Sequence, residues 1–528
     1  MRRTVWLWLW LSACAPARST GPKGVGARLV EGGGQALVVA PHAAAALYLR
    51  SPAHPTGKLM PPDAYLGELS LVSPDNSVHS LGRAVTNLTG NLAFSADGRK
   101  VAFLDNFSFA GHQGDLVLAD LATGSLKPVA ADVGYFGFAP QGSTLGYIAS
   151  ATGVLKVGPG DASDQVIEAQ VATFEFLGDD VLYRLRSTAG GALRRAALGK
   201  AAAQTIAVKV GDYQVSPDGK SVAYSIANRD GTSDLHVTRW GAADRKLGEE
   251  VTSFHFSPDG KSIAYVAGLD PHKLLGDLFI AEVERDTAPQ RLGKAAGTYR
   301  FSADGRLGFI HDYYEPTRAG KFSLWDPIHG TVLVADSARV FGFSPSGRSL
   351  GFLKRVFKPL YTEQLMLLPL GAPGAPLAEA RLIGEGIYAF DFTPDEKAIL
   401  YKADCTREGE ACDLMSVPTD APAMPLTDGG TGKNPLARKL VSGVDDYDFS
   451  PDGKWLWITF KEQIGHTVDL AVIPSQGESL PRYIDFKAEP GPRWTQAGKL
   501  TYLVDNPKRA GLYEADPALA QPLKLHGQ

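Results

Sequence analysis

Apolar residues at every second position flank a Ser-Pro-Asp-Gly sequence, and this pattern recurs along most of the chain. The clearest copy is FSPDGKSIAY, residues 256–265. Alternation at period two predicts two β-strands with one apolar face each. Pro258, Asp259 and Gly260 supply the backbone angles of a tight turn between these strands. Each copy is therefore predicted to be a β-hairpin that buries its apolar face against a neighbour.

The hairpin recurs about eleven times, at spacings of 38 to 57 residues. The copies start near residues 39, 94, 138, 176, 215, 256, 301, 343, 392, 449 and 494. A third strand follows each hairpin, as in GDLFIAE from Gly276, and then a short fourth strand, as in QRLG from Gln290. Four antiparallel strands in roughly 40 to 45 residues are typical of one blade of a β-propeller. The sequence predicts an all-β fold, a β-propeller of about eleven four-stranded blades.

About eleven blades exceed the number that one propeller ring usually holds, so we expect two propellers in tandem. A boundary near residue 250 gives a first propeller region at 36–250 and a second at 251–528. A boundary near residue 210 would separate four degenerate copies from seven clearer ones. The sequence does not choose between the two.

The FSPDGK hairpin and the Asp-Leu strand after it resemble the repeats of TolB-like propellers, a family related to WD repeats. The resemblance covers nearly all of the chain from residue 36 onward. It implies a periplasmic or surface scaffold that binds other proteins at the bacterial envelope. Periodicity by itself predicts only the fold.

Residues 1–13 have the features of a signal peptide: Arg2 and Arg3, a short apolar run, and small residues before Cys14. This segment resembles the lipobox of bacterial lipoproteins, which implies that the Cys14 thiol carries a lipid. A plain secretory signal cleaved elsewhere is the alternative. Residues 14–35 are rich in small residues, Pro and Gly, so we expect a flexible tether there.

These features predict an exported lipoprotein anchored to a membrane, in the periplasm or at the cell surface. Ala15 after the cysteine resembles the pattern of lipoproteins sent to the outer membrane, which applies where the host has one. The formal net charge is −4, and no basic stripe interleaved with aromatic residues is present. We therefore expect no nucleic-acid partner.

Cys405 and Cys412 lie seven positions apart, between two runs that read as strands. This spacing predicts a disulfide across a hairpin loop in an oxidising compartment. Two free thiols remain an alternative. A zinc site fits less well because no second pair of ligands lies nearby in the sequence. We predict no metal and no cofactor.

Aromatic residues gather in the loops between the second and third strands of several blades. Successive turns of a meander fall at opposite ends of the strands, so these loops share the face opposite the Ser-Pro-Asp-Gly turns. Exposed rings there would suit an envelope protein, a peptide or a glycan. The alternative is that the rings cap their own blades. The candidates are Phe107, Phe109, Tyr313, Tyr314, Phe357 and Tyr361.

A second candidate set lies on the innermost strands, between two aromatic or apolar residues just before each turn. Such residues would line a central channel and could hold a small ligand, or they could form hydrogen bonds between blades. The set is Glu175, Gln214, His255, Arg300, Asp391 and Asp448.

The H-E-x-x-H, P-loop and EF-hand patterns do not occur in the sequence. We therefore expect a binding protein and no enzyme. The competing hypothesis is a propeller hydrolase or lyase that acts on a glycan or peptide. It requires Asp391, Asp448 and Glu175 to converge within about 5 to 10 Å, the separation of paired glycosidase carboxylates.

Overall fold

The computed structural model describes residues 27–31, 34–39, 46–53, 64–72, 77–88, 90–188, 190–200, 202–270, 272, 275–357, 361–406, 409–425, 432–461, 467–476, 480–504 and 511–519. Cys14 and the predicted signal peptide lie outside these residues. Within them, the regular elements are β-strands and one 3₁₀ turn, η1 (Glu315–Thr317), and every strand pair is antiparallel. No helix in the described part of the chain is long and apolar enough to cross a membrane.

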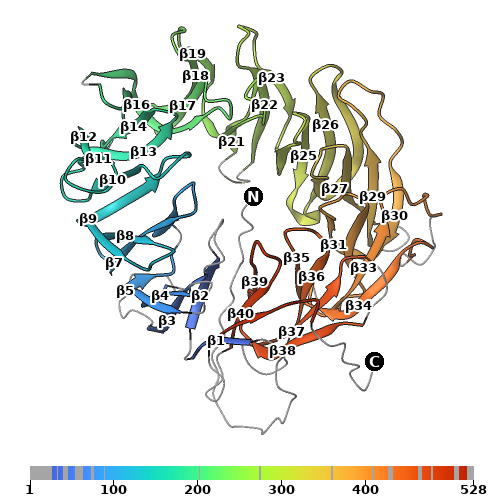
Figure 1. The fold of residues 1–528 in the computed structure, drawn as a ribbon. Coiled ribbons are helices and arrows are strands. Elements are labelled where there is room, and N and C mark those ends of the chain that lie inside the picture. The colour runs from blue at the N-terminus through green and yellow to red at the C-terminus, as the bar shows by residue number, and fades with distance from the viewer. Residues whose placement is uncertain are drawn as a thin grey trace. The chain divides into compact units, whose positions relative to one another are not determined.

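The chain divides into two compact units, and the first comprises residues 1–170 and 446–528 (Figure 1, blue and red). One four-stranded sheet consists of β2 (Gly34–Val39), β3 (Ala46–Ala53), β4 (Leu66–Val72) and β5 (Val78–Thr86), and a seven-stranded sheet consists of β6 (Leu92–Phe94), β7 (Lys100–Ser108), β8 (Gln113–Asp120), β9 (Leu126–Phe138), β10 (Leu145–Ala149), β11 (Leu155–Gly158) and β12 (Gln165–Glu168). A second four-stranded sheet consists of β35 (Asp446–Phe449), β36 (Trp455–Lys461), β37 (Val468–Pro474) and β38 (Arg482–Ala488). The last sheet consists of β39 (Arg493–Trp494), β40 (Leu500–Val504), β41 (Gly511–Ala515) and β1 (Ala27–Glu31).

The second unit comprises residues 171–445. One seven-stranded sheet consists of β13 (Val171–Leu177), β14 (Asp180–Leu185), β15 (Gly191–Ala197), β16 (Ala203–Val215), β17 (Ser221–Ala227), β18 (Ser233–Arg239) and β19 (Arg245–Gly248). The other seven-stranded sheet consists of β24 (Tyr299–Phe301), β25 (Leu307–Tyr314), β26 (Ala319–Asp326), β27 (Gly330–Phe343), β28 (Ser349–Val356), β29 (Thr362–Pro369) and β30 (Arg381–Glu385). The two four-stranded sheets consist of β20 (Val251–Phe256), β21 (Ser262–Asp270), β22 (Leu275–Glu282) and β23 (Gln290–Gly293), and of β31 (Ile387–Phe392), β32 (Ala398–Ala403), β33 (Cys412–Pro418) and β34 (Arg438–Val444).

Each seven-stranded sheet consists of two four-stranded meanders that share one long strand. In β27, for example, the first half pairs with β26 and the second half pairs with β28. β9 and β16 serve their sheets in the same way. The repeating four-stranded meander confirms the predicted all-β propeller fold. The blade total and the arrangement in two tandem rings stay predictions.

A buried serine organises the turn that the sequence repeats. Ser257 donates its hydroxyl to Asp259 at 2.7 Å, and its oxygen accepts the backbone N–H of Ser262 at 2.9 Å. Gly260 has φ = 72°, and its N–H bonds the Ser257 carbonyl at 2.9 Å. Ser257 is 1% exposed, so the side chain satisfies the buried backbone at the start of β21. The same hydroxyl-to-carboxylate bond recurs in five further copies, at Ser95, Ser216, Ser302, Thr393 and Ser450.

Apolar side chains from neighbouring meanders form the cores. One cluster joins Leu81 and Val85 of β5 to Val101 and Phe103 of β7, the second strand of the next meander. This is the physical reason for repetition, because one hairpin exposes an apolar face that only its neighbour covers.

Two differences from the predicted domain limits stand out. β1 (Ala27–Glu31) pairs with β41, so the tether prediction is wrong for these five residues, whose backbone groups are used in the last sheet. The candidate boundary near residue 250 lies between β19 and β20, inside the second unit, whose limits are residues 171 and 445.

Candidate binding surface

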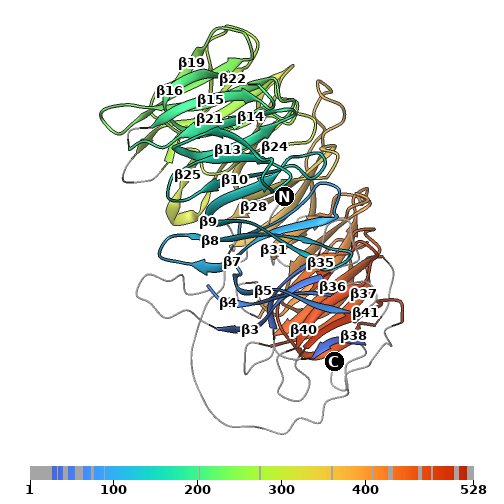
Figure 2. The same ribbon diagram turned by 60° about the vertical axis from the view of Figure 1, so that its left-hand side comes forward.

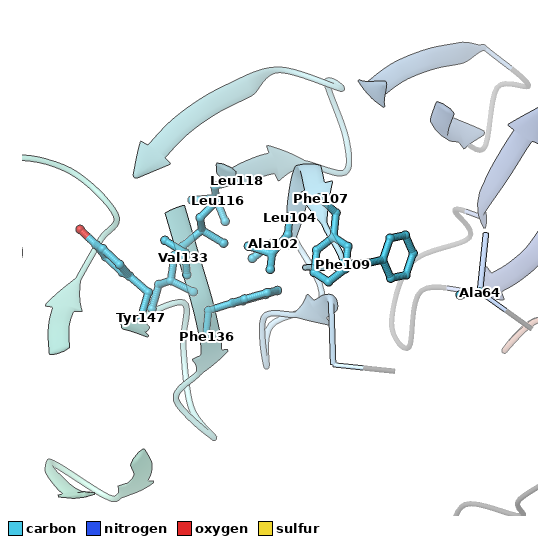
Figure 3. Close-up of a cluster of buried hydrophobic side chains, with 11 residues drawn as sticks. Ala64, Ala102, Leu104, Phe107, Phe109, Leu116, Leu118, Val133, Phe136 and Tyr147 are labelled. Atoms are coloured by element: carbon cyan, nitrogen blue, oxygen red, sulfur yellow. The ribbon is translucent and has the colours of Figure 1, made fainter. Parts of the chain in front are cut away.

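Phe107 and Phe109 belong to the core of the first unit and not to a binding face. They are 6% and 8% exposed, and their rings meet edge to face with centroids 5.1 Å apart. Figure 3 shows both rings next to Leu104 and Ala102 in one buried cluster. The expectation that they are exposed is wrong, because they cap their own meander.

The other candidate loop residues lie in the second unit, and three of the four are exposed. The exposed fractions are 61% for Tyr314, 49% for Phe357 and 59% for Tyr361. Tyr313 is half-buried and packs against the cluster that includes Phe322. The rings of Phe357 and Tyr361, on either side of the β28–β29 loop, have centroids 5.9 Å apart.

An Arg–Glu–Arg network lies next to the ring of Tyr361. Arg355 of β28 and Glu363 of β29 are cross-strand partners, and Arg355 Nε donates to Glu363 Oε1 at 2.9 Å. Arg339 donates Nε and Nη2 to the same carboxylate at 2.7 to 2.9 Å. Tyr361 adds a hydroxyl bond to Glu363 at 3.1 Å. The carboxylate is nearly buried and fixes both guanidinium groups.

The same network connects the β28–β29 hairpin to the β25–β26 connection and to β31. Arg355 also donates to the carbonyl of Thr317, in the β25–β26 connection that carries Tyr314. The guanidinium carbon of Arg355 lies 5.7 Å from the centre of the Tyr361 ring, a cation–π distance. Arg339 Nη2 donates to the carbonyl of Tyr388 at 2.6 Å, and its guanidinium lies 5.8 Å from that ring.

Two of these side chains stand at β-bulges. Between Ala338 and Val340 the pairing of β27 with β28 shifts by one residue, which leaves Arg339 as the extra residue. Tyr388 is the extra residue in the pairing of β31 with β32. A bulge redirects the side chain of its extra residue. β28 and β31 neighbour each other (Figure 2), so the two bulges direct Arg339 and Tyr388 toward one network.

The disulfide loop lies on the far side of Tyr388. Cys405 and Cys412 are bonded, and they join the ends of the β32–β33 connection. A Cβ added to Gly409 of this loop would lie 2.4 Å from Cε1 of Tyr388. Only glycine allows this approach, and its φ of 78° also favours glycine. The loop therefore holds Tyr388, which is 41% exposed.

We call this surface the aromatic–arginine face and define it as Tyr314, Phe357, Tyr361, Tyr388, Arg339, Arg355 and Glu363. Burial raises the pKa of Tyr361, and the neighbouring Glu363 carboxylate raises that pKa further. The tyrosine therefore stays neutral at physiological pH and remains a hydrogen-bond donor.

The innermost-strand set is spread over both units. Asp448 lies on β35 in the first unit, and the others lie on β13, β16, β20, β24 and β31 in the second. Gln214 accepts the backbone N–H of Phe256 at 3.3 Å, a hydrogen bond between adjacent meanders. His255 and Arg300 are exposed, and Asp391 is half-buried. Glu175 is also exposed, yet desolvation by surrounding protein atoms raises the pKa of its carboxyl.

Sequence reasoning found the loop aromatics and missed Arg339, Arg355, Glu363 and Tyr388. Arg355 and Glu363 flank the RVFKPLYTE loop, and their opposite charges next to a predicted turn were a usable signal. Arg339 and Tyr388 gave no such signal, because a bulge cannot be read from alternation. No group of three His, Cys, Asp or Glu able to hold a metal ion occurs in the described ranges.

No protein-family model matches this sequence, and no curated protein matches it. A search of solved structures finds similarity to a eukaryotic initiation factor, with a TM-score of 0.36 and 15% identity; the match covers 68% of this chain and 92% of that chain. It also finds similarity to the tricorn protease, with a TM-score of 0.27 and 14% identity; the match covers 89% of this chain and 46% of that chain. Both TM-scores are low. The β-propeller fold is taken from the strand topology itself, and no function is transferred.

Proposed function

We propose that this protein is an exported, lipid-anchored β-propeller that binds another protein of the bacterial envelope through the aromatic–arginine face. The resemblance to TolB-like repeats supports the scaffold role, and the lipobox-like sequence before Cys14 supports the anchor. A disulfide between Cys405 and Cys412 suits an oxidising compartment.

The observation that carries the proposal is the gathering of exposed aromatic rings around ordered arginines. Single exposed apolar residues are normal on soluble proteins, whereas a gathered group rimmed by charge marks an interaction site. Tyrosine and arginine are also the residue types that most often dominate binding energy. Arg339, Arg355 and Glu363 are held by mutual hydrogen bonds, so little side-chain freedom remains to be lost on binding.

A pull-down from the host's envelope extract tests the binding role. The bait is the mature chain with Cys14→Ser, and the test variant adds Tyr314→Ala and Tyr361→Ala. Tyr313 is left intact because its ring packs against the core. The matched control is Tyr135→Ala, which removes a 46%-exposed ring from β9 of the first unit. A protein retained by the bait and the control and lost from the test variant supports the proposal. Equal retention by all three refutes this face as the site.

The anchor is tested separately by labelling the host with a radioactive fatty acid. Label on the wild-type chain that disappears in Cys14→Ala supports lipidation. Label that persists in the variant, or none in either chain, refutes it.

A hydrolase or lyase is the second candidate, and the raised pKa of Glu175 is the observation that favours it. A carboxyl that stays protonated to higher pH can act as a general acid. The test is release of reducing ends or free amines from envelope glycan and peptide fractions by wild type and Glu175→Gln. Activity that the variant loses would replace the binding proposal with catalysis.

A further inference from the structure

We propose that the aromatic–arginine face binds an acidic peptide segment in which a carboxylate lies next to an aromatic or branched aliphatic side chain. This inference rests on the proposed binding function and adds the chemistry of the partner. The charge, the unused hydrogen-bond donors and the fixed geometry of the face each support it.

The face carries one net positive charge. Two guanidinium groups, those of Arg339 and Arg355, share the single carboxylate of Glu363. In the adjoining loop the charges of Glu315 and Arg318 offset each other. Glu363 already accepts hydrogen bonds from both arginines and from Tyr361, so it does not neutralise the second guanidinium. In the sequence the loop between Phe357 and Tyr361 adds a further positive charge, Lys358, so the charge of this region favours an acidic partner.

Both arginines keep N–H groups for a ligand. Arg339 uses Nε and Nη2, and Arg355 uses Nε and Nη1, in bonds to protein acceptors. In the part of the chain that the structure describes, Nη1 of Arg339 and Nη2 of Arg355 bond no acceptor. Their side chains are 27% and 12% exposed, so an incoming carboxylate would meet donors that are largely desolvated.

The rings around these donors determine what accompanies the carboxylate. Tyr361 and Tyr388 each stack near one arginine, and Phe357 packs beside Tyr361. Their exposed area is apolar, and it is buried favourably only by an apolar group of the partner. A peptide that alternates acidic and apolar side chains offers both groups within a few ångströms, whereas a free inorganic anion offers only the charge.

Fluorescence anisotropy with defined peptide pools tests this chemistry. The first pool of labelled octapeptides has Asp or Glu beside Phe, Tyr, Leu or Ile at the two central positions. In the second pool Asn or Gln replaces the acid, and in the third Ala replaces the apolar residue. We expect the first pool to bind the mature protein at least about tenfold more tightly than the other two, and more weakly as salt is raised.

Matched variants test whether the peptide binds at the aromatic–arginine face. We expect Arg339→Gln to weaken binding about tenfold or more and Tyr361→Ala to weaken it comparably, because the first removes a positive charge and the Nη1 donor and the second removes an apolar contact surface. Arg339→Lys keeps the charge and loses the planar guanidinium group that Glu363 orients, so it should bind more weakly than wild type. The control is Arg348→Gln, which makes the same charge change at an exposed site at the opposite end of β28. Its affinity should equal that of wild type.

Equal binding of the acidic and amide pools overturns the inference, and so does full affinity in Arg339→Gln. Equal weakening by Arg348→Gln would mean unspecific charge attraction and also overturns it. Displacement of peptide by an anionic oligosaccharide at lower concentration than by unlabelled peptide would identify a glycan site instead. If the pull-down yields a partner that Tyr314→Ala with Tyr361→Ala loses and Arg339→Gln keeps, only the acidic chemistry fails and the proposed function stands.

Discussion

The turns that begin at Ser344 and Thr393 depart from the repeat in complementary ways, and this predicts sign epistasis. Ser346 stands where other turns have aspartate, and Glu396 stands where they have glycine. Glu396 accepts the Ser346 backbone N–H, the Ser346 hydroxyl at 2.7 Å and the Ser344 hydroxyl at 3.1 Å. The carboxylate missing from one turn is thus supplied by the next. We expect Glu396→Gly and Ser346→Asp each to destabilise the second unit and the double variant to restore its stability.

The magnitudes follow from these contacts. Glu396 has φ = 60°, and its replacement by glycine relieves about 1 kcal/mol of left-handed strain. The substitution also removes three hydrogen bonds to a carboxylate, at about 1 kcal/mol each in this partly exposed position. Glu396→Gly should therefore lower the free energy of unfolding by about 2 kcal/mol. Ser346→Asp alone brings two carboxylates together near Ser344 and should cost about 1 to 2 kcal/mol.

The double variant recreates the Ser–Asp–Gly arrangement of Ser257, Asp259 and Gly260, so its stability should equal or exceed that of wild type. The coupling energy of the cycle is then about 3 kcal/mol. Thermal unfolding measures it, because about 1 kcal/mol shifts the midpoint by about 2 °C in a body of this size.

Glu250→Gly is the matched control for the release of left-handed backbone strain by glycine. Glu250 also has a positive φ, 52°, and its exposed side chain makes no hydrogen bond to another described residue. This variant should raise the midpoint slightly or leave it unchanged. If Glu396→Gly behaves like Glu250→Gly, or if the effects of the double variant simply add, the proposed compensation between the turns is refuted.

Three further predictions concern stability. Arg306 is 1% exposed and donates to Asp304 and to three backbone carbonyls. Arg306→Met should therefore lower the free energy of unfolding in urea by about 3 to 5 kcal/mol. A decrease below about 1 kcal/mol would contradict this. The Ser450 hydroxyl and a backbone N–H lower the pKa of Asp452 to about 2. Its ionised carboxylate therefore stabilises the fold above the unfolded-state pKa near 3.8, and this contribution is lost as pH falls toward 2. Asp452→Asn should make the unfolding midpoint less dependent on pH between 4 and 2, although solvent screening keeps the effect small. Replacement of Cys405 and Cys412 by serine should cost about 2 kcal/mol and weaken binding at the neighbouring Tyr388, measured by thermal unfolding and anisotropy.

The fold was predictable because the sequence of each meander specifies its own strands and turn. Period-two alternation around Asp259 and Gly260 specifies two strands and a turn, and repetition specifies what covers their apolar faces. The role of Ser257 was not predicted, since its two hydrogen bonds depend on burial that only the packed sheet creates. The strand at Ala27–Glu31 was missed for a similar reason: it forms by pairing with β41, far away in sequence.

The candidate site was predictable only in part. A loop aromatic reads the same in sequence whether it caps its own sheet, as Phe107 does, or faces solvent, as Tyr361 does. The difference depends on loop length and on what lies beneath the ring. Phe107 is still within β7 and turns inward, whereas Tyr361 stands on an Arg355–Glu363 pair that is too polar to bury it.

In a repeat protein, the residues common to all copies specify the fold, so the information for binding lies in the departures from the repeat. The bulge at the start of the innermost strand is such a position. Gly134, Ala172 and Thr252 occupy it in other meanders, where a small side chain suffices for the backbone shift. In two neighbouring meanders the position holds Arg339, which bonds Glu363 and the Tyr388 carbonyl, and Tyr388, whose ring is 41% exposed. These departures from the small residues are what the proposed binding function would use, because neither side chain is required by the bulge itself.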